Sequence, residues 1–77
     1  MNAARRKKLS EILSKIEAAS ADLDAVKEEE QEAFDNLSEG LQQSEQGQNA
    51  EAAVQAMDNA MQSLNDAGAS IEEAQGT

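Results

Sequence analysis

Apolar residues recur along this chain at alternating spacings of three and four, and this period constrains the fold more than any other feature. Strand alternation fits nowhere, whereas a three-in-seven apolar stripe is typical of a helix that buries one face. The stripe first occupies Leu9, Ile12, Ile16, Ala19, Leu23, Val26, Ala33 and Leu37, with Leu13, Phe34 and Leu41 on a flanking row. It returns at Ala50, Ala53, Met57, Ala60, Leu64, Ala67, Ile71 and Ala74, with Val54, Met61 and Gly68 beside it.

The break between the two stripes predicts a loop joining two helices. The intervening residues are polar and include Gly40 and Gly47, which we interpret as helix stops because glycine tolerates the left-handed conformation. Asn2 and Asn49 are expected to cap the two helices, since asparagine accepts hydrogen bonds from free N–H groups at a helix start. The chain is therefore expected to form helices over about 3–37 and 49–75, with a loop over 38–48 that includes a short helical turn near Leu41.

Matched apolar stripes on two long helices favour an all-α, coiled-coil-like antiparallel hairpin over residues 1–77, as a single domain. A turn centred near residue 43 would place Ile16 opposite Ile71 and Leu23 opposite Leu64. Glu30 lies on the stripe, either reaching water at its edge or setting the register, as buried polar groups do in coiled coils. A chain of 77 residues without Cys or His has no disulfide or zinc staple. We therefore expect self-association, as a dimeric four-helix bundle or larger assembly.

The residue types needed for catalysis are scarce in this chain. It contains no His, Cys or Tyr, and its serines have no neighbouring base to activate them. Its carboxylates lack the Glu-x-x-His pattern of a bundle metal site, and no glycine-rich phosphate loop is present. The sequence therefore predicts a non-enzymatic protein with no catalytic residue, no metal site and no cofactor.

The charges are distributed unevenly along the chain, whose formal net charge is −10. Arg5, Arg6, Lys7 and Lys8, which we call the basic cluster, are four of its six basic residues and lie where a helix begins. Cations oppose the helix dipole there, so either nearby carboxylates at the C-terminus offset them or they form a site for a phosphorylated ligand. The remaining surface is acidic, which makes direct binding of nucleic acid unlikely on electrostatic grounds and leaves imitation of nucleic acid open.

No apolar run approaches the ~20 residues that cross a membrane, and no apolar segment follows the basic start as in a signal peptide. The expectation is a cytoplasmic protein without membrane contact.

One segment resembles a known group of proteins. Residues 28–37 read EEEQEAFDNL, and LQQSE follows at 41–45. This stretch resembles small uncharacterised helical proteins encoded by phages and prophages, which read approximately EEEQEAFDNLPESLQxSERGE. The resemblance extends over most of the chain, with a specific core of about eighteen residues. Ser38 stands where the pattern has Pro, and Gln46 where it has Arg.

The resemblance implies a phage origin and action on host machinery, in the host cytoplasm. We expect an interaction protein that binds and modulates a host protein such as a defence component. Its recognition site would be the tip, defined as Asp35, Asn36, Leu37 and Leu41, although Phe34 and Leu41 could instead close the end of the hairpin core. The alternatives are a sponge that holds a phosphorylated nucleotide-type ligand on the basic cluster, an acidic mimic of nucleic acid, and a structural protein whose partner is itself.

Overall fold

The structure, a computed structural model that describes residues 1–77, consists of helices and short connections without any strand. Helix α1 spans Ala3–Asp35, α2 spans Glu39–Gln42 and α3 spans Glu45–Gly76. The molecule measures 58 × 15 × 12 Å. The predicted all-α class is confirmed. No helix is long and apolar enough to span a bilayer.

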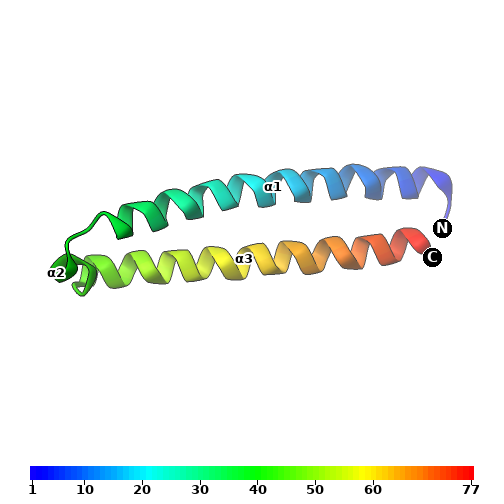
Figure 1. The fold of residues 1–77 in the computed structure, drawn as a ribbon. Coiled ribbons are helices and arrows are strands. Elements are labelled where there is room, and N and C mark those ends of the chain that lie inside the picture. The colour runs from blue at the N-terminus through cyan, green and yellow to red at the C-terminus, as the bar shows by residue number, and fades with distance from the viewer.

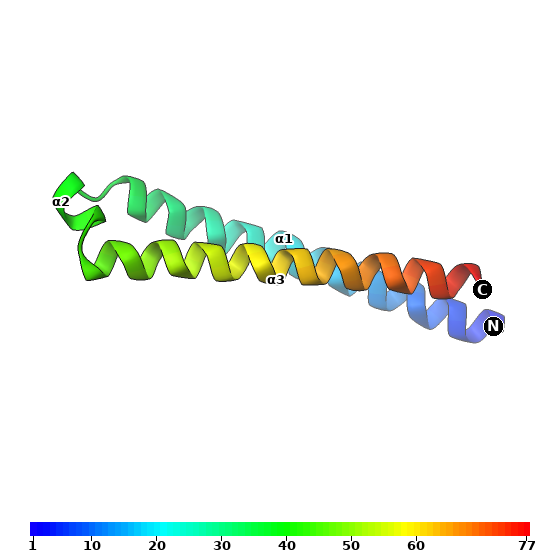
Figure 2. The same ribbon diagram turned by 90° about the horizontal axis from the view of Figure 1, so that it is seen from below.

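The two long helices lie side by side and run in opposite directions, and α2 links them at one end of the rod (Figure 1). The chain termini meet at the other end, where Arg6 Nε donates to the Gln75 carbonyl at 3.1 Å and Gln75 Nε2 donates to the Arg6 carbonyl at 3.2 Å. Seen from below, the helix axes cross at a shallow angle (Figure 2), as in a coiled coil. Side chains of both helices therefore meet along nearly their whole length.

Local capping determines where each helix begins. The Asn2 side chain accepts a hydrogen bond from the Arg5 N–H, as expected from the sequence. Ser38 caps α2 by accepting from the Leu41 N–H, so this residue starts a helix at the position where the phage pattern has proline. Ser44 caps α3. The second long helix thus starts at Glu45, and the prediction of a cap at Asn49, now inside α3, is wrong.

Gly47 does not end a helix, contrary to the sequence prediction. It lies in the first turn of α3, it is buried, and no glycine in the chain has a positive φ. A Cβ at Gly47 would come within 2.6 Å of the Gln42 Cα and closer still to the Gln42 carbonyl group. Glycine is required here because the backbones of α2 and α3 touch. Gly40, the other predicted stop, lies within α2 in open space.

We call the row of residues through which α1 and α3 face each other the seam. About half of the α1 residues predicted for it lie there, and the other half do not. The prediction is right for Leu9, Ile16, Leu23, Glu30 and Leu37 and wrong for the residues between them. Leu13, Ser20, Lys27 and Phe34 are half-buried between those positions, whereas Ile12 and Val26 are 41% and 52% exposed. On α3 the predicted Ala53 and Ala74 are half-buried, as are the flanking residues Val54, Met61, Gly68 and Gln75, whereas the predicted Ala60 and Ala67 are exposed.

The register also differs from the expected pairing. A Cβ on Gly68 would lie 3.9 Å from Leu13 Cδ2, and Lys27 Nζ reaches Asp58 Oδ1 at 2.8 Å. In these contacts each α1 residue meets an α3 residue that lies roughly half a turn to one and a half turns nearer the start of α3 than expected. The reason is that α3 starts at Glu45, which shortens the connection and shifts the point of reversal. Glu30 is half-buried and makes no ion pair or side-chain hydrogen bond.

Candidate functional site

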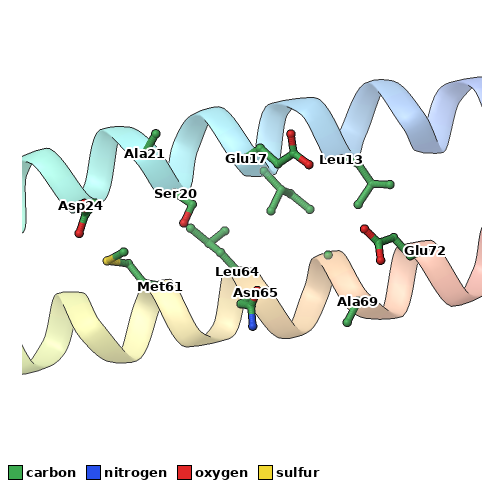
Figure 3. Close-up of a pocket in the computed structure, with 12 residues that line it drawn as sticks. Leu13, Glu17, Ser20, Ala21, Asp24, Met61, Leu64, Asn65, Ala69 and Glu72 are labelled. Atoms are coloured by element: carbon green, nitrogen blue, oxygen red, sulfur yellow. The ribbon is translucent and has the colours of Figure 1, made fainter.

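One groove is hollowed into the long face between α1 and α3, with a volume of about 500 Å³. Its floor is mainly apolar, with the Ser20 hydroxyl beside Leu64, and polar side chains line its edges (Figure 3). The lining residues are Leu13, Ile16, Glu17, Ser20, Ala21, Asp24, Met61, Leu64, Asn65, Gly68, Ala69 and Glu72. We call this the acidic groove.

Small residues on both helices produce the hollow. Ser20 and Ala21 on α1 and Gly68 and Ala69 on α3 leave space where larger side chains would meet. Gly68 leaves an opening next to Leu13, whose methyl carbon would make only ordinary contact with an added Cβ. The groove thus results from four small residues that the helix pairing brings to one face.

The edges of the groove carry negative charge. Glu17 and Asp24 project from α1 and Glu72 from α3, and no Lys or Arg is among the lining residues. In Figure 3, Glu72 extends from α3 toward α1 beside Leu13, and Asp24 extends from α1 toward Met61. Glu17 and Glu72 form no ion pair within the chain. Carboxylates above an apolar floor form a surface complementary to a ligand that is both basic and apolar.

A single lysine partly neutralises one end of the groove. Lys27 Nζ lies 2.8 Å from Asp58 Oδ1 and 3.9 Å from Asp24 Oδ1. The hydrogen bond to Asp58 raises the pKa of Lys27 above its ordinary value of 10.5, against a partial desolvation that lowers it, and the charges of Asp58, Asp24 and Glu28 add to the increase. Asp24 therefore carries the most compensated of the three groove charges.

The basic cluster is exposed in the first turns of α1. The C-terminus of α3 ends beside it (Figure 1), yet no carboxylate lies within ion-pair distance of any of its four cations. Only Arg6 is engaged, through the carbonyl of Gln75. The carboxylates near the C-terminus, including Glu72 and Glu73, therefore form no ion pair with the basic cluster.

The predicted tip residues lie around the end of α1 and in α2. Asp35 ends α1 and accepts a hydrogen bond from Gln31, Asn36 is the C-cap, and Leu37 is half-buried. Leu41 is 47% exposed on α2, whereas Phe34 is half-buried. The side chain of Gln42 is half-buried at this end and donates to the Phe34 carbonyl at 3.1 Å. These residues form an end of the rod without a hollow.

Sequence reasoning missed the acidic groove as a site. The carboxylates of Glu17 and Asp24 were visible as part of an acidic face, but their joint position with Glu72 depends on the pairing of the two helices. The available signal was the presence of small residues at 20–21 on one helix and at 68–69 on the other, which the helix pairing brings to the same face at neighbouring levels. No group of three or more potential metal ligands gathers anywhere in the chain.

Comparisons of the chain with protein-family models, with curated proteins and with solved structures found no match.

Proposed function

We propose that this chain is a non-enzymatic interaction protein that binds a basic, apolar segment of another protein in the acidic groove. The observation that carries the proposal is the combination of three carboxylates, no lining cation and an apolar floor in the one hollow of the molecule. A helix or strand presenting Lys or Arg beside aliphatic side chains would satisfy both parts of this surface.

The charge of the whole molecule supports a basic partner. A net charge of −10 on 77 residues attracts cationic surfaces from a distance and accelerates their encounter. Specificity would then come from the groove, because its carboxylates sit over a floor that selects apolar side chains. The resemblance to phage-encoded proteins motivates a host protein, such as a defence component, as the partner.

The protein in this proposal is a coiled-coil hairpin that self-associates into a four-helix bundle and acts in the cytoplasm. Self-association is supported by the thin core of the helix pair: Gly47 and Ala50 are the only buried residues, and no large side chain is fully enclosed. A chain of this size needs further burial or a staple to reach ordinary stability.

Binding of a fluorescent amphipathic helical peptide of Leu and Lys tests the groove. In the groove variant, Glu17→Gln, Asp24→Asn and Glu72→Gln remove three charges without changing side-chain size. The matched control carries Glu32→Gln, Asp66→Asn and Glu73→Gln, which are exposed, lie outside the groove and reduce the net negative charge equally. We expect affinity to fall at least tenfold in the groove variant and less than threefold in the control, with binding weakened by salt. Equal losses in both variants would reject the groove in favour of general charge attraction.

A second candidate function is a sponge for a phosphorylated small molecule, and it is favoured by the absence of ion pairs at the basic cluster. Titration of wild type and of the Arg5→Ala, Arg6→Ala double variant with a nucleoside triphosphate tests it. Binding by wild type that the double variant loses, with helicity unchanged, would support the sponge, and equal affinities would exclude it.

A further inference from the structure

The face opposite the acidic groove carries a row of apolar residues on each long helix, and most of these residues are exposed. The groove collects the residues that flank one side of the seam on both helices, so the residues that flank its other side share the opposite face. On α1 these residues repeat every seventh position as Ile12, Ala19, Val26 and Ala33. On α3 they are Ala53, Ala60, Ala67 and Ala74, of which the middle two are exposed and the outer two half-buried. We call this the alanine face.

The α3 half of the alanine face is free of charge. Beside this row of alanines, on the side away from the seam, lies an outer row that consists of Asn49, Ala56, Ser63 and Ser70. The α1 half adds the two most exposed aliphatic side chains of the helix pair, Ile12 at 41% and Val26 at 52%. Small side chains allow close approach of another helix layer, and the two aliphatic residues provide apolar area to bury.

The exposed area matches what one partner contributes to a standard interface. The chain exposes 5439 Å², whereas a folded monomer of 8.2 kDa typically exposes about 4,500 Å². The excess of roughly 900 Å² is close to the ~800 Å² that each partner buries in a standard-size complex. A second layer of helices of the same length would cover it.

We propose that a second copy of this chain packs on the alanine face about a twofold axis that passes at Ala19, with the two α1 helices antiparallel. In this arrangement Ile12 lies opposite the partner's Val26, because both are seven residues from Ala19. Ile16 comes within one residue of the level of the partner's Leu23, so the half-buried seam residues of both copies meet at the centre of a four-helix bundle.

Charge complementarity selects this direction. The outer row of α1 on the alanine face carries Lys8 and Lys15 toward its start and Asp22 and Glu29 toward its end. None of the four forms an ion pair within the chain. The twofold that brings Ile12 to the partner's Val26 also brings Lys15 to the partner's Asp22 and Lys8 to the partner's Glu29. A layer packed with α1 against the partner's α3 would leave these charges without partners, because that row of α3 is uncharged.

The same axis fits both helices. On α3 the alanines of this face are symmetric about a level near Ser63, midway between Ala60 and Ala67. The contacts of Leu13 with Gly68 and of Lys27 with Asp58 place Ala19 at that level to within about one turn. A single twofold axis across the rod therefore pairs α1 with the partner's α1 and α3 with the partner's α3.

This interface leaves both acidic grooves on the outer surfaces of the bundle. The dimer would then present two grooves facing away from each other, which lets it hold two copies of a basic partner. This consequence rests on the proposed function, whereas the interface itself stands without it.

The first test is the mass of the protein in native mass spectrometry and in light scattering after gel filtration. We expect wild type to be a dimer, and Ala19→Glu to be monomeric because two carboxylates would meet on the axis. Ala18→Glu is the matched control: it adds the same charge on the neighbouring exposed alanine, which points away from the alanine face. Monomeric wild type, a larger assembly, or dissociation of Ala18→Glu as readily as Ala19→Glu would overturn the proposal.

Disulfide formation between two copies tests the position of the axis directly. The chain contains no cysteine of its own, so a single introduced cysteine can pair only with its copy in the partner. Under mild oxidation Ala19→Cys should form a covalent dimer rapidly, and Ala18→Cys should form it at least tenfold more slowly. Equal rates would reject an axis at Ala19. Because these readouts concern mass and cross-linking, a dimer without peptide binding would reject only the groove, and peptide binding by a monomer would reject only the interface.

Discussion

Replacing Gly47 and Gly68 by alanine in separate variants should change stability in opposite directions. Both glycines lie inside α3, where alanine is favoured over glycine by about 1 kcal/mol through helix propensity alone. If α3 were an isolated helix, both variants would be equally stabilised. The difference in unfolding free energy between the two variants therefore reports how much space surrounds an added Cβ at each position.

At Gly68 the added Cβ would lie 3.9 Å from Leu13 Cδ2, which is an ordinary van der Waals contact. The gain in helix propensity is then kept, and partial burial of the methyl group adds up to ~0.5 kcal/mol. We expect Gly68→Ala to raise the free energy of unfolding by about 1–1.5 kcal/mol, which for a domain of this size corresponds to roughly 5–10 °C in Tm.

At Gly47 the added Cβ would overlap the backbone of Gln42. Backbone atoms cannot rotate away as a side chain does, so α2 must move off the start of α3. That movement would loosen the Ser44 cap and the hydrogen bond from Gln42 to the Phe34 carbonyl. Overpacking of this kind typically costs about 1–3 kcal/mol and exceeds the propensity gain. After subtraction of the propensity gain of about 1 kcal/mol, we expect Gly47→Ala to lose up to about 2 kcal/mol net.

Urea and thermal unfolding followed by far-UV circular dichroism, repeated at several protein concentrations to account for association, would measure both effects. Gly40→Ala serves as a control, because an added Cβ there meets nothing within 4 Å. Equal stabilisation by Gly47→Ala and Gly68→Ala would refute the contact between α2 and the first turn of α3.

Three further perturbations test the seam. Leu13→Asp should abolish cooperative unfolding because Leu13 faces α3, whereas Ile12→Asp, one residue away and 41% exposed, should leave a folded helix pair; the reverse result in circular dichroism would restore the phase expected from the sequence. Glu30→Leu should raise stability by about 1 kcal/mol in urea unfolding, because a half-buried carboxylate without an ion pair is replaced by an apolar group, and a loss would indicate a hidden partner for Glu30. The pKa of Lys27 is raised in the folded state, so its ion pair stabilises the fold at neutral pH, and this stabilisation is lost as pH rises above about 10.5 and through the folded pKa. The stability difference between wild type and Lys27→Gln should therefore shrink above that pH. A constant difference would contradict the ion pair with Asp58.

The sequence determined the helices because their signals are local. The period of the apolar residues specified two long helices, and Asn2 capped the first as expected, since an N-cap interacts only with its own first turn. The short helix near Leu41 also followed from local composition. The start of α3 was mistaken because serine and asparagine are both good caps, and Ser44 and Asn49 compete for the role.

The seam phase and the groove were decided only by the tertiary structure. On α1, Leu9, Ile16 and Leu23 belong to two possible stripes, one completed by the row of Ile12 and the other by the row of Leu13. On α3 the same choice exists between the rows of Ala60 and Met61. The helical period alone does not distinguish these stripes. The choice between Leu13 and Ile12, or between Met61 and Ala60, depends on how the large residues of one helix meet the small residues of the other. The fit of Leu13 beside Gly68, the pairing of Lys27 with Asp58 and the contact of Gly47 with Gln42 settle that choice together. Because each joins residues far apart in the chain or across a turn, none is encoded in the period of a single helix, and the position of the three groove carboxylates follows from them.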